Sequence, residues 1–209
     1  MALPTIETPT YELTLPSADI KVKFRPFLVK EEKILLQALE SGDNKQISQA
    51  LKDIVSACTF GQIDGGKIPT FDLEYIFLQI RSKSVGEVAK LKLLCPDDKR
   101  TYADVEIDLS KVEVQVDDTH TNNIVIDKDR NFGIIMKYPT IDTVEPETNL
   151  KNVRTEKLFE MIANCMHEIY DGETVHSLSD YSKEETNKFL ESLDRKTFDK
   201  INVFFESMP

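Results

Sequence analysis

Apolar and polar residues alternate with a period of two in two neighbouring stretches near the middle of the chain. In Ala89–Leu93 the apolar positions alternate with two lysines, and in Val105–Leu109 they alternate with acidic residues. This period is typical of half-buried β-strands, and the segment Cys95–Arg100 between them is rich in turn-forming residues. The pattern therefore predicts a β-hairpin.

The register of this hairpin is predicted by two independent patterns. Folding about Asp98 pairs Leu91 with Val105, Leu93 with Ala103, Lys92 with Asp104 and Lys90 with Glu106. Apolar pairs then share one face and opposite charges share the other, and both kinds of pair stabilise adjacent strands. The hairpin specifies a sheet and contains no pattern that points to chemistry.

The segment before this hairpin predicts a second, shorter hairpin followed by three helices. Two alternating runs within residues 11–24 flank a turn sequence. Helical periodicity follows in three stretches, Val29–Glu40, Ile47–Cys58 and a stretch that begins near Thr70. We expect these helices to pack on the Leu91/Val105 face of the central hairpin.

The segment after it predicts one more strand pair and then helices. The strands are Ile124–Ile126 and Phe132–Tyr138. An apolar stripe with helical spacing runs from Leu158 to Ile169, and Ser182 with Glu185 forms a capping box for a following helix. The prediction is an α+β fold, an antiparallel sheet with N-terminal helices packed on it and a C-terminal helical part. Its domains would be residues 1–139, a linker 140–152 and a helical subdomain 153–209.

Composition narrows the classes of function. The chain carries 26 basic and 37 acidic residues, a net charge of −11, with most of the excess after residue 116. No lysine and arginine cluster is dense enough for a phosphate-binding surface, which argues against nucleic acid as a partner. The first residues show no signal peptide, no window is apolar enough to span a membrane, and three widely spaced cysteines favour a reducing compartment.

The candidate chemical sites are incomplete as read from the sequence. Cys95 at the tip of the central hairpin is where a zinc ribbon would place a ligand. A structural zinc site needs four ligands, however, Asp98 would be an unusual second one, and the sequence contains no other ligand pair. The segment Asp127–Asn131 begins like a calcium loop and lacks its glycine and its closing glutamate. Three histidines, His120, His167 and His176, match no nucleophile or metal motif. We therefore assign no catalytic, cofactor-binding or metal-binding residues.

The last predicted helix contains many large apolar residues for an element at the end of the chain. Its apolar residues are Phe198, Ile201, Phe204 and Phe205, with Met208 beyond them. Two interpretations stay open: the helix docks on the body of the protein, or these residues are an apolar surface kept for a partner. The four residues are our candidate partner-binding set.

Three segments of the chain resemble one known family. They are YELTLPSADIKVKFRPFLVKEEKILL (residues 11–36), FDLEYIFLQIRSKSVGE (71–87) and LLCPDDKRTYADVEIDL (93–109), and the likeness extends through NFGIIMKYP (131–139). Together they are similar to the baseplate hub assembly proteins of T-even-type, contractile-tailed bacteriophages. The chain length agrees as well.

The resemblance implies a phage late protein that acts in the host cytoplasm. It would be needed to build the central hub of the tail baseplate as an assembly chaperone, a hub component or both, and its presence in the finished virion stays open. Its partners would be other hub proteins, with a homo-oligomer as a further option, and no catalysis or cofactor is implied. The alternative functions are a small metal- or nucleic-acid-binding module built on the Cys95 hairpin, and a hydrolase whose carboxylates meet only in the fold.

Overall fold

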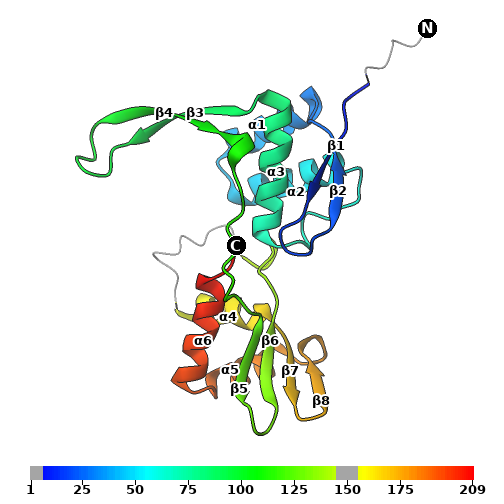
Figure 1. Ribbon diagram of the computed structural model, residues 1–209, viewed down its shortest axis with the longest axis vertical. Helices are drawn as coiled ribbons and strands as arrows, with labels where there is room; N and C mark the ends of the chain where they lie inside the picture. The colour runs from blue at the N-terminus through cyan, green and yellow to red at the C-terminus, as the bar shows by residue number, and fades with distance from the viewer. Residues whose placement is uncertain (1–6, 145–154) are drawn as a thin grey trace. The chain divides into compact units, whose positions relative to one another are not determined.

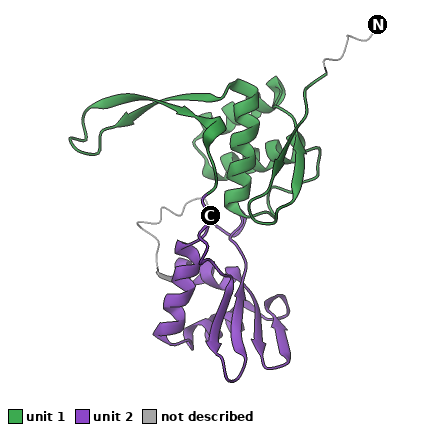
Figure 2. Cartoon of the chain, viewed as in Figure 1, with its two compact units in different colours: residues 1–114 green, residues 115–209 purple. Residues whose placement is uncertain are grey.

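The computed structural model describes residues 7–144 and 155–209. The chain forms two compact units, residues 1–114 and 115–209 (Figure 2). Both helices and antiparallel sheets are present (Figure 1), which confirms the predicted α+β class. Of the predicted linker 140–152, residues 145–152 lie outside the described residues, and the segment just before them forms a bridge and turns.

Unit 1 contains two hairpins and three helices. Its elements are β1 (Tyr11–Thr14), β2 (Lys21–Phe24), α1 (Val29–Ser41), α2 (Asn44–Cys58), α3 (Thr70–Val85), β3 (Val88–Leu94) and β4 (Tyr102–Asp108), followed by a 3-10 turn, Leu109–Lys111. The first hairpin pairs β1 with β2, and the second pairs β3 with β4, each as a separate two-stranded sheet. The predicted short hairpin and three helices are thus confirmed.

The core of unit 1 lies between the first hairpin and the helices. Its buried apolar residues come from β1, the turn after it, β2, α2 and α3: Leu13, Leu15, Val22, Phe24, Ile54, Val55, Leu73, Ile76 and Ile80. Two capping residues define the turn between α1 and α2. Gly42 takes a left-handed conformation (φ 65°) that ends α1, and the Asp43 carboxylate accepts the Lys45 amide N–H at 2.9 Å to start α2.

The register predicted for the β3–β4 hairpin is confirmed. Leu91 lies opposite Val105 and Lys92 opposite Asp104, and all seven residues of each strand pair without a shift. The helices, however, do not cover its Leu91/Val105 face, so that expectation was wrong. The hairpin extends away from the helices as a long ribbon (Figure 1), and Leu91 and Leu93 are 42% and 47% exposed. Instead, α2 and α3 bury their apolar residues in the core with the β1–β2 hairpin, whereas the large apolar residues of α1 stay mostly exposed.

Unit 2 is a four-stranded antiparallel sheet with three helices. Its elements are β5 (Asn123–Asp127), β6 (Phe132–Met136), α4 (Thr155–Cys165), β7 (Met166–Asp171), β8 (Thr174–Ser177), a 3-10 turn (Leu178–Asp180), α5 (Lys183–Glu191) and α6 (Arg195–Glu206). The strand order is β5-β6-β7-β8. The strand pair around Asp127–Asn131 and the capping box, in which the Ser182 side chain and the Glu185 side chain each bond the other's backbone, are confirmed.

The prediction that the stripe ending at Ile169 is one continuous helix was wrong. The helix ends at Cys165, and β7 follows at once, with Ile169 opposite Ile134 of β6. Apolar spacing alone cannot separate a helix end from a strand start, and here the open edge of β6 decides the conformation. One local feature does indicate a strand here: Gly172 (φ 64°) begins a two-residue turn that joins β7 to β8 as a hairpin.

This pairing also decides which residues share a unit. Because β6 hydrogen-bonds to β7, residues 115–139 belong with the C-terminal helices. The compact units therefore divide the chain between Val114 and Gln115, whereas the sequence prediction divided it after residue 139. The C-terminal part also contains two strands besides its helices.

Candidate interaction surfaces

The β3–β4 hairpin exposes an uncovered apolar face. Side chains alternate between the two faces of a strand, so the odd-numbered residues share one face. That face carries Ala89, Leu91, Leu93, Ala103, Val105 and Ile107. Only Ala89, beside the helices, is buried, while Leu91, Leu93 and Ile107 are all at least 36% exposed. A two-stranded ribbon is marginally stable in water, and one with a bare apolar face is typical of a surface that another protein covers.

The opposite face of this hairpin is charged along its middle, with Val88, Leu94 and Tyr102 exposed at its two ends, and its tip is a closed turn. The Lys90 ammonium lies 2.9 Å from the Glu106 carboxylate. At the tip, Asp98 accepts the Thr101 hydroxyl and the amide N–H groups of Thr101 (3.0 Å) and Arg100 (2.9 Å). These hydrogen bonds lower the pKa of Asp98 to about 2. The carboxylate that a metal at this tip would need is therefore engaged in holding the turn.

The Cys95 thiol lies at the start of the same turn. Hydrogen bonds from the backbone of Asp97 and Asp98 lower its pKa. In residues 7–144 and 155–209, no group of three or more histidine, cysteine, aspartate or glutamate side chains is placed to hold a metal ion. The calcium-like segment forms the β5–β6 turn, where the Asp127 carboxylate accepts the amide N–H of Asp129 at 2.9 Å.

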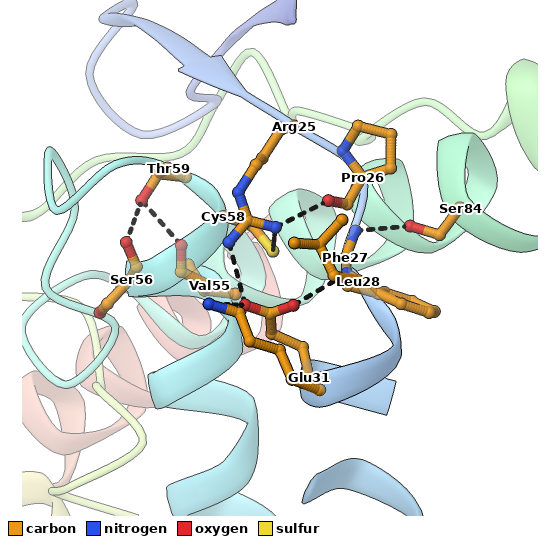
Figure 3. A network of polar contacts seen from close by, with 11 residues as sticks. Arg25, Pro26, Phe27, Leu28, Glu31, Val55, Ser56, Cys58, Thr59 and Ser84 are labelled. Carbon is orange, nitrogen blue, oxygen red and sulfur yellow. Dashed lines mark hydrogen bonds and ion pairs between the residues drawn. The ribbon is translucent and has the colours of Figure 1, made fainter. Parts of the chain in front are cut away.

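A buried ion pair joins three elements of unit 1. The Arg25 guanidinium lies 2.9 Å from the Glu31 carboxylate, and the two side chains are 11% and 4% exposed (Figure 3). Arg25 also donates to the Pro26 carbonyl oxygen (2.9 Å) and to the Cys58 sulfur (3.8 Å). Glu31 accepts the Leu28 amide N–H at 2.8 Å, which caps the start of α1. The group therefore links the end of β2 to both α1 and α2.

This network lies in the segment RPFLVKEEK that carries part of the family resemblance. Burial raises the pKa of Glu31, but hydrogen bonds from Arg25 and the Leu28 amide outweigh it, and the net pKa is lowered. Burial raises the pKa of the Cys58 thiol to about 11. The Glu31 carboxylate is ion-paired and hydrogen-bonded, and the Cys58 thiol is unreactive at neutral pH. Both properties indicate a structural role for these residues.

The candidate residues of the last helix divide into two kinds. Ile201 and Phe204 are 0% and 1% exposed and belong to the core of unit 2. They cannot contact a partner while α6 stays docked, which corrects their assignment as contact residues. Phe198 and Phe205 are half-buried at the edge of that core. Phe198 stacks on Phe159 of α4 with ring centroids 5.5 Å apart.

The histidines make pairwise contacts with neighbouring polar groups. The His120 ring lies between the Ser207 hydroxyl (2.8 Å) and the Tyr138 hydroxyl (2.9 Å), and it stacks on Tyr138. His176 bonds the Tyr181 hydroxyl at 2.7 Å. These contacts connect the loop before β5 to the end of α6, and β8 to the turn before α5.

A shallow apolar pocket of about 360 Å³ lies in unit 2, and sequence analysis missed it. It lies between β6, β7, β8 and α5, with an apolar lining that includes Phe132, Ile169, Leu178 and Phe189. Asp171 and Glu185 add carboxylates to the lining. Because two of these strands were predicted as helix or loop, no sequence pattern brought the lining residues together.

The fold and its surfaces are typical of a protein that binds other proteins. An uncovered apolar ribbon, a buried structural ion pair and closed turns together favour binding to other proteins. The chain matches the family model of the T4 bacteriophage base plate protein over residues 8–209, and it belongs to that family. This confirms the resemblance to T4-type baseplate proteins. Searches of curated proteins and of solved structures found no significant match.

Family membership assigns the protein to the phage baseplate proteins and implies interactions with other baseplate proteins. Among the helices of the described residues, none combines the length and the apolar character that crossing a bilayer requires.

Proposed function

We propose that this base plate protein serves, without catalysis, to assemble the central hub of the phage tail baseplate in the host cytoplasm. It acts as an assembly chaperone, a hub component or both, through contacts with other hub proteins. The observation that carries the proposal is the uncovered apolar face of the β3–β4 hairpin. A baseplate protein with such a face has a surface ready to bind a neighbouring protein.

The apolar face can make a measurable contribution to the affinity for a partner. Leu91 and Leu93 retain 42% and 47% of their surface in the chain by itself. If a partner covers the exposed surface of these two leucines, the burial contributes roughly 2 kcal/mol to the binding free energy. This corresponds to a factor of about thirty in affinity. Because most of the net charge of −11 lies after residue 116, we expect the partner surface that meets this C-terminal part to be basic and the association to weaken with salt. The half-buried Phe198 and Phe205 are a second, smaller proposed contact.

The test is a binding assay between the full chain and each purified hub protein of the same phage. We expect at least one hub protein to bind, and the variant L91S/L93S to bind at least about tenfold more weakly. Serine removes the apolar surface and leaves the backbone pairing of β3 in place. Circular dichroism of each variant checks that it is folded.

A matched variant on another element controls for the general loss of exposed leucines. Leu36 and Leu39 of α1 are 53% and 52% exposed, so L36S/L39S removes a similar apolar surface outside the hairpin. Its binding should match that of the unmodified chain. Binding that is lost in L36S/L39S and kept in L91S/L93S would assign the contact to α1. A chain that binds none of the hub proteins would refute the proposed function.

A further inference from the structure

Within the part of the chain that the structure describes, no further strand pairs with either outer edge of the β3–β4 hairpin. The Cys95 amide N–H donates to the Thr101 carbonyl oxygen (2.8 Å), and the Leu109 amide N–H donates to the Glu87 carbonyl oxygen (2.7 Å). Hydrogen-bonded pairs alternate along an antiparallel ladder, so the odd-numbered residues between these positions bond across the hairpin. The backbone groups of the even-numbered residues therefore point outward, away from the partner strand.

These even-numbered residues give the two edges opposite charges. Lys90 and Lys92 lie along the β3 edge. Asp104, Glu106 and Asp108 lie along the β4 edge. Their side chains share the polar face of the ribbon, opposite the apolar face. Charged side chains on edge strands usually prevent pairing between molecules. Charge repulsion prevents such pairing only when the two edges carry the same charge. When the edge of one copy is basic and the edge of the other is acidic, the charges attract.

We infer that the β3 edge of one copy pairs with the β4 edge of a second copy, as an antiparallel extension of the sheet. In this arrangement the outward amide and carbonyl groups of the even-numbered residues bond between copies. Lys90 and Lys92 then face Asp104 and Glu106 of the neighbour, as they already face their own. The apolar faces of both hairpins lie on the same side of the extended sheet, because every second residue keeps its face.

The charge pattern selects this arrangement over two-fold symmetric ones. Pairing β4 with a second β4 sets acidic residues opposite acidic residues, and pairing β3 with β3 sets lysine opposite lysine, both of which are destabilising. The pairing of unlike edges is heterologous, so it continues from copy to copy or closes into a ring. The hairpin itself, Val88–Asp108, carries four basic and five acidic residues in a chain of net charge −11. The ribbon therefore adds little to the repulsion between acidic chains.

Sedimentation velocity of the full chain over a range of concentrations tests the inference. We expect the unmodified chain to associate beyond a dimer as its concentration rises. The variant K90E/K92E makes both edges acidic, and its apparent dissociation constant should rise by roughly tenfold or more. The variant K90E/K92E/D104K/E106K reverses both edges, keeps the net charge, and should recover the association. An equal mixture of K90E/K92E with D104K/E106K should also associate.

Two further measurements separate edge pairing from other effects. The variant K33E/K128E makes the same change in net charge at two exposed lysines outside the hairpin, and it should associate like the unmodified chain. Hydrogen exchange reports the pairing directly: the amides of Lys90, Lys92, Asp104 and Glu106 should exchange slowly only in the associated protein. The odd-numbered amides should stay protected at every concentration, which also shows that the hairpin is folded in each variant.

Three results would overturn the inference. The unmodified chain could stay monomeric at every concentration, K90E/K92E could associate as well as the unmodified chain, or the even-numbered amides could gain no protection on association. A folded four-residue variant that fails to recover association argues equally against the pairing of unlike edges. None of these results decides whether a hub protein binds the apolar face, which L91S/L93S tests separately.

Discussion

Removing Arg25 should destabilise unit 1 by about 3 kcal/mol, because it leaves the Glu31 carboxylate buried without its main partner. Breaking a buried ion pair by deleting one member costs roughly 3–5 kcal/mol. The lower end applies here, since Glu31 keeps the Leu28 amide N–H at 2.8 Å and the exposed Lys30 ammonium at 3.4 Å. Methionine is the suitable replacement, because it preserves most of the volume of the arginine side chain.

The expected loss depends on pH in a definite direction. The pKa of Glu31 is lowered in the folded chain. Its charge therefore stabilises the fold above the unfolded pKa, and this contribution is lost as the pH falls through the folded pKa. In R25M the buried carboxylate lacks the arginine, its pKa rises, and acid neutralises it. The difference in stability between the two proteins should be largest near neutral pH and should shrink in acid.

Hydrogen exchange in increasing urea, read by mass spectrometry on peptides of α2, measures the stability of unit 1 separately from unit 2. The matched control is K21M, which removes the exposed ion pair between Lys21 and Glu12 (3.4 Å, side chains 72% and 47% exposed) and should cost at most about 1 kcal/mol. R25M/E31Q should be more stable than R25M, because glutamine keeps an acceptor for the Leu28 amide and carries no charge. A loss in R25M no larger than that in K21M at pH 7 would refute the reasoning.

Two shorter predictions test other parts of the fold. Burial raises the pKa of the Cys58 thiol to about 11 and that of Cys165 to about 12, whereas backbone hydrogen bonds lower that of Cys95. Peptide mapping after brief alkylation of the native chain should thus find Cys95 modified first, and the other two only after unfolding; equal rates would contradict the structure. Gly133→Ala should destabilise unit 2 by more than about 2 kcal/mol, since its Cβ would overlap the Tyr170 ring and come within 2.7 Å of a backbone oxygen. Exchange in urea on β7 peptides measures this loss, and a stability equal to that of the unmodified chain would contradict it.

The parts of the fold that local patterns specify were predictable from the sequence. The β3–β4 register follows from side chains that meet across one turn, and apolar and charged residues agree on it. The first three helices follow from apolar stripes, acidic first turns and a glycine at Gly42. Each of these features is decided by residues that are close together along the chain.

The predictions from sequence that were wrong concern parts of the fold that depend on contacts between residues distant along the chain. Whether Met166–Asp171 continues a helix or forms a strand depends on β6, whose edge is about thirty residues away along the chain. The pocket lined by Phe132 and Phe189 could not be predicted for the same reason. Alternation in Ala89–Leu93 shows that one face is apolar, but it does not show what covers that face. The sequence therefore led us to expect helices where the structure leaves the face exposed.

The β3–β4 hairpin has room for both proposed contacts, the partner protein and the second copy. The odd-numbered side chains form the apolar face, while the outward backbone groups belong to the even-numbered residues, so a partner on the face and a second copy at an edge use different atoms. A hub protein bound to Leu91 and Leu93 leaves the Lys90 and Lys92 edge free. Copies joined edge to edge would present their apolar faces side by side on one surface. Partner binding and self-association should therefore reinforce each other, because a partner that spans two adjacent hairpins gains from both.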